Sequence, residues 1–466
     1  MEIRKVKWHN HPILGNLELD FCDEHGNPYK NIILAGENGT GKTTILETIA
    51  TFLDGGTFTP FEYIEYEAEG HIMKAVSQND VHGSDGFYDV IDDSGIRHAM
   101  RTMKNFNNPD IDNNHMNIRF YGFALSKARS EYKTNIISSA TSQQLDLSNK
   151  ETDDNDDFTS LKQLIIDVQA QDDEEYRLWS EDRSKQNLKI DFNEFYTNYS
   201  KIGRFKNAFN NFFDRLKFDS CSTRNHQKMI VFKKNGKDIG IDNLSTGEKQ
   251  IVFRGTHLLQ NINKINDTTV FVDEPEISMH PSWQDKILQY YQELFTDGDT
   301  HQQKSQIFFA THSEHIVRIA LKDRANNLVI VLKEKAGVIH KKKVIAPSVL
   351  STITSAETNF LAFNIPSIDY HIELYAHIQN TLVSPLHGGS SSIKQVDEFI
   401  THCSNYNVTY DKSYTHNTIT YNSLCTFIRN CIDHPSAKYS YTDEELEKSI
   451  CLMIQIIKNS RSDSAK

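Results

Sequence analysis

A glycine-rich string near the N-terminus constrains the fold of this chain more than any other feature of its sequence. Residues 36–43 read GENGTGKT, which matches the pattern G-x-x-x-x-G-K-[ST]. The apolar run NIILA (31–35) precedes the string, and residues 42–53 carry apolar side chains at helical spacing. Between a strand and a helix, such glycines let backbone N–H groups turn towards phosphate oxygens at the positive end of the helix. The string therefore predicts a phosphate-binding loop.

The side chains at the end of this loop have separate expected roles. Lys42 would neutralise charge on the β- and γ-phosphates of a nucleotide, and Thr43 would be a ligand of Mg²⁺. A glycine loop that arose by coincidence is the alternative, and the flanking strand and helix argue against it. The residues that we expect to bind nucleotide here are Gly36, Asn38, Gly39, Gly41, Lys42, Thr43 and Thr44.

A second motif is an apolar strand that ends in adjacent carboxylates. Residues 269–274 read TVFVDE, which places Asp273 and Glu274 at the carboxyl end of the strand. We expect Asp273 to hold Mg²⁺ through water and Glu274 to polarise the attacking water, because both would lie beside the phosphate-binding loop. Alone, the pattern is only a strand that meets a turn. Together with the loop it predicts nucleotide hydrolysis.

A third motif, LSTGEKQ at residues 244–250, precedes a helical stretch and resembles the signature LSGGQ of ABC-type ATPases. Thr246 and Glu248 depart from that signature, as they do across its soluble relatives. In this family the signature binds the γ-phosphate held by the opposite subunit, so the resemblance implies that Ser245, Gly247 and Glu248 belong to an ATP site. Alternatively, Ser245 followed by Glu248 would cap a helix, and both roles use the same exposed N–H groups.

A fourth motif, FFATHS at residues 308–313, is a strand that ends in a single histidine. Such a histidine is usually structural, but in this position His312 resembles the switch histidine that contacts the γ-phosphate. The run DEPEISMHP (273–281) resembles that of the RecF, structural-maintenance-of-chromosomes (SMC) and OLD ATPases, where it crosses the dimer interface. Weaker candidates for a nucleotide-contacting arginine and a Q-loop are Arg119 and either Gln143 or Gln144.

The resemblance covers residues 1–55 and about 240–332, in the order of the family's motifs. It implies a Mg²⁺-dependent ATPase that binds ATP between two copies of itself. The short interval between the motifs resembles the compact ATPases of anti-phage defence, first those of the Septu systems and second those of the PARIS systems. There the ATPase forms a homo-oligomer and controls a separate nuclease, so we expect an effector nuclease as partner and nucleic acid to be reached through it.

Alternating strands and helices in residues 239–332 predict a mainly parallel sheet with helices on both faces. The expected fold class is α/β, an ABC-type P-loop ATPase with a short inserted helical arm and a mostly helical C-terminal domain. The expected strands are 269–273, 306–311 and 328–332, and the expected helices are 246–261, 281–295 and 313–322. The expected domains are an ATPase lobe (1–140), the arm (141–235), a second ATPase lobe (236–346) and the C-terminal domain (347–466).

Composition narrows the class of protein. A net charge of −13 argues against a protein that coats nucleic acid with its whole surface. The six cysteines form no C-x-x-C pair, which argues against a zinc site or a disulfide framework. No apolar run approaches the ~18 residues that would span a bilayer, and the N-terminus lacks the apolar core of a signal peptide. We therefore expect a cytoplasmic protein without a membrane partner.

The C-terminal region leaves an alternative open. Residues 421–434 form an amphipathic helical pattern that contains Arg429 and His434, and R-x-x-x-x-H is the pattern of HEPN ribonucleases. A helix that ends before Pro435, with a histidine at its C-terminus, explains the same residues. The alternatives to a regulatory ATPase are thus an ATP-gated HEPN-like ribonuclease and a RecF-like DNA-repair ATPase. The basic run 333–343 indicates a solvated hairpin edge rather than a nucleic-acid contact.

Overall fold

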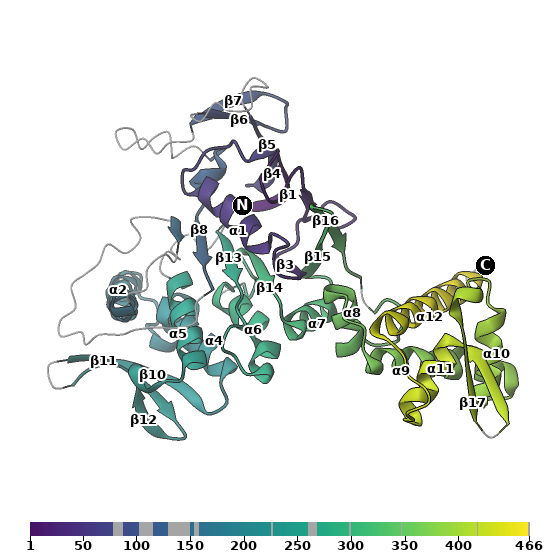
Figure 1. Cartoon of the computed structure of the whole chain (residues 1–466). Helices are drawn as coiled ribbons and strands as arrows, with labels where there is room; N and C mark the ends of the chain where they lie inside the picture. The colour runs from purple at the N-terminus through teal and green to yellow at the C-terminus, as the bar shows by residue number, and fades with distance from the viewer. Residues whose placement is uncertain are drawn as a thin grey trace. The chain divides into compact units, whose positions relative to one another are not determined.

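The chain divides into two compact units, Met1–Lys343 and Val344–Lys466, which we describe separately. Figure 1 shows the elements of both. Among the described residues, no helix is long and apolar enough to cross a membrane. The computed structural model describes residues 1–77, 87–101, 115–128, 150–152, 158–224, 227–259, 268–297, 300–345, 347–416 and 418–464.

A seven-stranded sheet of order β16-β15-β3-β14-β13-β8-β9 forms the centre of the first unit. All neighbouring pairs are parallel except the edge strand β16, which pairs antiparallel with β15. This confirms the α/β class with a mainly parallel sheet and places the basic run on an edge hairpin. The strands are β3 (Asn31–Gly36), β8 (Phe123–Ser126), β9 (Lys150–Thr152), β13 (Thr269–Asp273), β14 (Gln306–Thr311), β15 (Asn327–Lys335) and β16 (Val338–Lys343).

The three central strands β3, β14 and β13 are buried along their whole length, as apolar runs in parallel sheets are. Three helices follow these strands, and the last two along the chain begin at clear capping residues. The His280 ring accepts a hydrogen bond from the Ser282 amide with Pro281 next in the chain, and the Ser313 hydroxyl accepts one from the Ile316 amide. These helices are α1 (Lys42–Leu53), α6 (Pro281–Leu294) and α7 (Glu314–Lys322).

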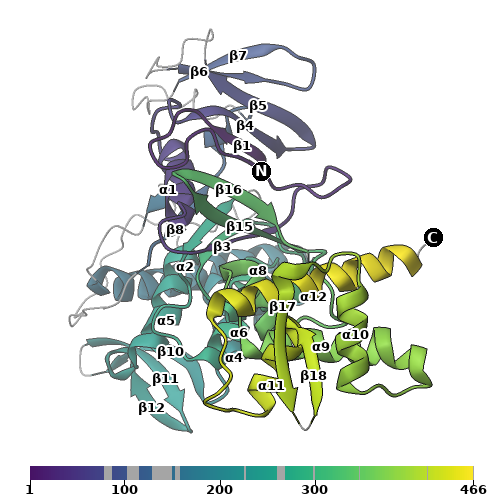
Figure 2. The same ribbon diagram turned by 45° about the vertical axis from the view of Figure 1, so that its right-hand side comes forward.

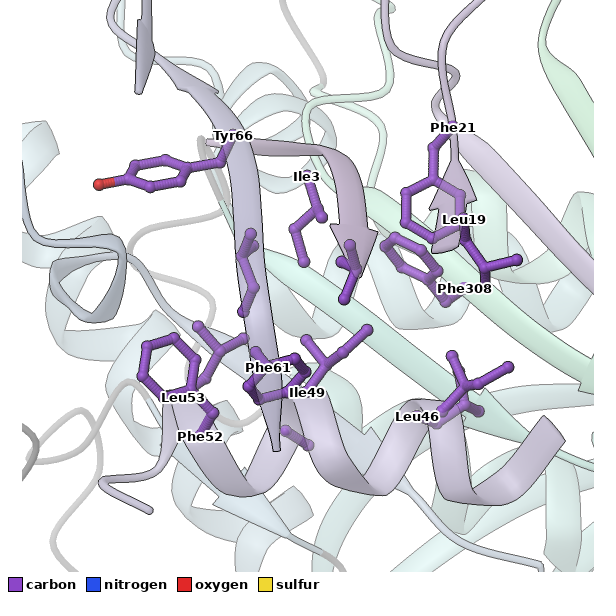
Figure 3. Close-up of a cluster of buried hydrophobic side chains, with 14 of the residues drawn as sticks. Ile3, Leu19, Phe21, Leu46, Ile49, Phe52, Leu53, Phe61, Tyr66 and Phe308 are labelled. Atoms are coloured by element: carbon purple, nitrogen blue, oxygen red, sulfur yellow. The ribbon is translucent and has the colours of Figure 1, made fainter. Parts of the chain in front are cut away.

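A six-stranded antiparallel sheet of order β2-β1-β4-β5-β6-β7 packs on α1. Figure 3 shows Ile49, Phe52 and Leu53 of α1 beneath Phe61 and Ile3 of the sheet. The Phe52 ring is 1% exposed and lies 5.2 Å from Phe58 and 5.7 Å from Phe61. This core fixes the helix that begins at the phosphate-binding loop. The strands are β1 (Glu2–Trp8), β2 (Glu18–Asp20), β4 (Phe61–Ala68), β5 (His71–Ser77), β6 (Phe87–Ile91) and β7 (Arg97–Arg101).

Between β9 and α5 (Thr246–Leu259) lies an insert that contains both helices and strands. The sequence predicted a helical arm, and a three-stranded antiparallel sheet at residues 216–240 was not expected. Its strands mix lysines with apolar residues, and Phe218 and Phe232, paired across the sheet, are buried against rings of the preceding helix rather than by a local periodicity. The elements are α2 (Phe158–Lys185), α3 (Phe192–Asn198), α4 (Lys201–Phe212), β10 (Leu216–Arg224), β11 (Gln227–Lys234) and β12 (Lys237–Gly240).

The second unit is mainly helical around its own apolar core, as predicted, but it also contains a hairpin. Figure 2 shows β17 and β18 beside α11. The expected helix at 421–434 begins only at Leu424, because residues 419–423 pair as a strand and the Ser423 hydroxyl caps the helix. The elements are α8 (Ser355–Phe363), α9 (Ile368–His377), α10 (Ile393–His402), β17 (Asp411–His416), β18 (Ile419–Ser423), α11 (Leu424–Asp433) and α12 (Asp443–Ser464).

The packing of α1 predicts a large loss of stability when Phe52 is truncated. We expect Phe52→Ala to lower the free energy of unfolding by roughly 3–5 kcal/mol, because the cavity would lie in a core that cannot close around it. Phe192→Ala, which truncates a phenylalanine that is 54% exposed in the same unit, is the control and should cost far less. Urea denaturation measures both. Equal losses would contradict the account of this core.

Candidate functional site

The backbone of residues 36–41 has the conformation that a phosphate-binding loop requires. Gly36, Gly39 and Gly41 have φ angles of 139°, 81° and 83°, where a side chain would be strained. A Cβ atom on Gly36 would lie 2.2 Å from the carbonyl oxygen of Leu332, and one on Gly41 would lie 2.5 Å from Leu14. The glycines therefore allow the loop to close tightly between neighbouring elements.

Lys42 lies inside this loop. Its ammonium group donates hydrogen bonds to the carbonyl oxygens of Gly36 at 2.9 Å and Glu37 at 2.8 Å. Burial lowers the pKa of Lys42 to about 8, although Glu274 and Asp273 act in the opposite direction. The buried ammonium donates to two carbonyls of the loop, and burial destabilises its charged form. An anionic ligand beside it would stabilise that charged form again.

The Thr43 hydroxyl, in the first turn of α1, meets the Asp273 carboxylate at the end of β13. The hydroxyl donates to Oδ1 at 3.0 Å and approaches Oδ2 at 3.2 Å. Burial raises the pKa of Asp273 to about 6, the bond from Thr43 lowers it, and the neighbouring Glu274 raises it further. An adjacent carboxylate and hydroxyl are the hard oxygen donors that Mg²⁺ prefers, so these two residues fit the metal.

Glu274 and His312 face each other beside these residues. The His312 Nε2 atom lies 3.6 Å from a carboxylate oxygen of Glu274, and the two side chains are 31% and 32% exposed. Burial lowers the pKa of His312, and the charge of Lys42 lowers it further. A neutral histidine beside a partly exposed carboxylate leaves the carboxylate able to accept a proton from water.

The signature residues form a reciprocal cap at the start of α5. The Ser245 amide donates to Glu248 Oε2 at 2.8 Å, and the Glu248 amide donates to the Ser245 hydroxyl at 3.4 Å. Lys234 of β11 forms an ion pair with Glu248 at 2.7 Å, and the Glu248 side chain is 5% exposed. Glu248 thus shapes the turn that carries the exposed Ser245, and its expected contact with nucleotide stays a prediction.

Close packing at Gly247 explains why the signature turn needs a glycine. A Cβ atom there would lie 2.7 Å from the carbonyl oxygen of Ser278, in the segment that follows β13. The signature and the carboxylate strand are therefore in close contact within one protomer. Gly247 is buried by this contact, and Ser245, two residues earlier, stays exposed.

The remaining candidates lie in different places. Asn38 is exposed on the loop, and Thr44 is half-buried in the first turn of α1. Arg119 is 3% exposed, and its guanidinium donates to the Arg101 carbonyl of the antiparallel sheet at 3.0 Å. A side chain buried in this way offers no exposed charge to a nucleotide. Gln143 and Gln144 lie outside the described residues.

Two buried charged residues that sequence reasoning did not select support the carboxylate turn. Arg254 of α5 donates to the carbonyl of Glu274 at 3.0 Å. Glu276 accepts hydrogen bonds from the Thr311 hydroxyl at 2.8 Å and the His312 amide at 2.6 Å. A charged residue within the apolar face of a helix was the signal that could have identified Arg254, and the repeated acid of DEPE was the signal for Glu276.

The C-terminal candidates are paired within their own helix. The Arg429 guanidinium forms an ion pair with Asp433 at 2.5 Å and donates to the Asn430 side chain at 2.9 Å. The exposed His434 follows the helix, with its ring 5.3 Å from that of His416. The pairing with Asp433 occupies the charge that would bind an RNA phosphate. Within the part of the chain that the structure describes, no group of three or more His, Cys, Asp or Glu residues could hold a metal ion.

Comparisons with known proteins give a family. A family model described as "AAA domain, putative AbiEii toxin, Type IV TA system" matches residues 32–318, more than half of the chain. Similar solved structures include an SMC head bound to the C-winged helix domain of ScpA, with 13% identity, a TM-score of 0.40, and coverage of 75% of this chain and 100% of that chain. An SMC head domain from Thermotoga maritima has 14% identity, a TM-score of 0.33, and coverage of 74% and 99%. No curated protein matches the chain.

The raised pKa of Asp273 predicts a stability gain when its charge is removed. The carboxyl titrates near pH 6 in the folded protein against 3.8 as its ordinary value. Between these values the folded state holds the proton more strongly than the unfolded state, so stability falls as pH rises from about 4 to 6, by up to about 3 kcal/mol. Asp273→Asn removes this loss and can still accept the Thr43 bond.

We therefore expect ligand-free Asp273→Asn to be more stable than the wild type at pH 7.5, with the difference shrinking towards pH 4. Urea denaturation at several pH values measures it. The control is Asp285→Asn, which removes a partly exposed carboxylate that forms an ion pair with Arg318. This substitution should not stabilise the protein. A wild-type protein that is more stable than Asp273→Asn at pH 7.5 would show that this carboxylate is not destabilised by burial.

Proposed function

The chain belongs to the AAA_21 family of AAA-domain proteins, and we propose that it is an ATPase switch in which two copies close around ATP and control a separate effector nuclease in anti-phage defence. The observation that carries the ATPase part is the meeting of Thr43 and Asp273 at 3.0 Å, beside the buried Lys42. The ATP-dependent pairing, the effector and the role in defence go beyond the family.

The residues divide the chemistry of hydrolysis among them. Lys42 and the loop amides would bind the β- and γ-phosphates, and Thr43 with Asp273 would hold Mg²⁺. When bound, Mg²⁺ supplies charge neutralisation on the phosphate oxygens. Glu274 orients the attacking water and takes its proton, and His312 stands next to it to contact the γ-phosphate. Catalysis by positioning and electrostatics needs no covalent step on the protein.

The exposed signature supports a site shared between protomers. Ser245 lies at the start of α5, where the helix end presents partial positive charge to an anion. Gly247 and Glu248 are buried, whereas Ser245 is exposed and therefore accessible to a second protomer. We propose that this helix end binds the γ-phosphate held by Lys42 of the partner copy, and that the arrangement is reciprocal about a two-fold axis.

The separate C-terminal unit supports control of another protein. It has its own apolar core, so it can hold a surface for a partner without taking part in hydrolysis. The family description names a putative toxin of a toxin–antitoxin system, which agrees with a role in defence. A net charge of −13 favours contact with nucleic acid through the effector rather than through this chain.

A mixing experiment tests the shared site. Lys42→Ala removes the phosphate charge of one site, and Ser245→Glu places a negative charge where the signature would meet the γ-phosphate. Each variant alone should be inactive. A 1:1 mixture should recover activity, up to about a quarter of the wild-type rate, because half of randomly formed dimers are mixed and each mixed dimer holds one intact site. A mixture as inactive as its components would contradict a site made of two protomers.

The effector is tested by affinity purification from the native host, with and without ATP. We expect a nuclease to co-purify in fixed proportion with the wild-type chain, and Glu274→Gln, which should bind ATP without hydrolysing it, to change the amount retained. Removal of residues 344–466, the unit with its own core, should abolish retention. Recovery of the chain alone, in every nucleotide state, would contradict control of an effector.

A further inference from the structure

Arg254 is a buried cation that donates hydrogen bonds to backbone carbonyls of the carboxylate turn. It lies on α5, and 1% of its surface is exposed. Its Nη1 atom donates to the carbonyl of Glu274 at 3.0 Å, and its Nη2 atom donates to the carbonyls of Asp273 and Lys127 at 2.5 and 2.6 Å. One planar guanidinium thus holds two consecutive carbonyls after β13 and the end of β8.

The turn that Arg254 holds is strained. Glu274 has a φ angle of 43°, a left-handed conformation that side chains rarely adopt, and its amide donates to the Ala310 carbonyl at 2.8 Å. Such a conformation persists only where its surroundings over-determine it. The hydrogen bond from Arg254 to the Glu274 carbonyl is one of these determinants, and it fixes the backbone from which the catalytic carboxylate extends towards His312.

The same helix carries the signature. Arg254 lies nine residues after Ser245, which is about 14 Å along an α-helix. Further contacts tie this stretch of α5 to its neighbours: the Tyr290 hydroxyl donates to the Ile251 carbonyl at 2.8 Å, and a Cβ atom on Gly255 would lie 2.0 Å from that hydroxyl. With no room for a side chain there, α5 and α6 are closely packed at this point.

We propose that Arg254 is a positioning residue that couples the signature of a protomer to Glu274 of the same protomer. When Ser245 engages ATP held by the partner copy, α5 shifts, and Arg254 transmits the shift to the peptide between Asp273 and Glu274. Occupation of one site thereby speeds hydrolysis in the other, above the rate that an intact site has alone. This inference rests on the proposed pairing around ATP, and it adds the route by which each site senses its counterpart.

The substitution Arg254→Lys tests the coupling, because a lysine keeps the charge but donates from a single nitrogen and lacks the planar, spread donors that reach the three carbonyls from Arg254. We expect the kcat for ATP hydrolysis to fall at least 30-fold, while the Kd for a fluorescent ATP analogue and the ATP-dependent dimer stay within about threefold of wild type. Arg254→Ala should behave likewise if it folds. The control is Arg318→Ala. Arg318 lies on α7 and forms ion pairs with Asp285 of α6 and Glu314 of α7, and this variant should hydrolyse ATP at the wild-type rate.

A mixture of Arg254→Lys with Lys42→Ala tells whether Arg254 acts on Glu274 of its own protomer or only at the interface between protomers. The intact loop in such a mixed dimer belongs to the Arg254→Lys protomer, so the mixture must stay inactive, unlike the mixture of Lys42→Ala with Ser245→Glu. Recovery on mixing, a kcat within threefold of wild type, or a loss confined to ATP binding would each overturn the role of Arg254. Absence of hydrolysis by the wild type and by Arg318→Ala would instead overturn the proposed function itself.

Discussion

The hydrogen bond between Thr43 and Asp273 depends on the order of strands in the parallel sheet. The two residues are 230 positions apart, and they meet because β3, β14 and β13 are neighbours whose carboxyl ends share one edge. The same order brings His312, at the end of the middle strand, beside Glu274. The rest of the first unit supports this edge: the antiparallel sheet fixes α1 behind the loop, and α5 holds the carboxylate turn.

The site holds charges that the folded protein does not fully compensate. Burial lowers the pKa of Lys42 and raises that of Asp273, so both charged forms are less stable here than in water. Glu274 adds a strained backbone. Functional sites keep such unfavourable features because a ligand relieves them. In the proposed function, a phosphate at Lys42 and a metal ion at Asp273 would relieve them, and the stability lost by the free protein would add to its affinity for nucleotide.

The sequence was sufficient to place residues whose positions follow from local geometry. The glycines of the loop and the carboxylates after β13 could be placed from spacing alone, because strand, turn and helix fix their geometry. Arg254 and the sheet of residues 216–240 could not, because each is defined by partners far away in the sequence. In the second unit, β18 looked like the start of a helix until the pairing with β17 and the cap at Ser423 set the boundary.

The central claim is that ATP is hydrolysed between two copies of this chain. The most direct measurement is the ATP hydrolysis rate per protomer over a wide range of protein concentration, at saturating ATP and Mg²⁺. The account predicts a rate per protomer that rises with concentration and reaches a plateau as dimers form. A rate per protomer that stays constant down to concentrations at which the chain is a monomer would contradict it.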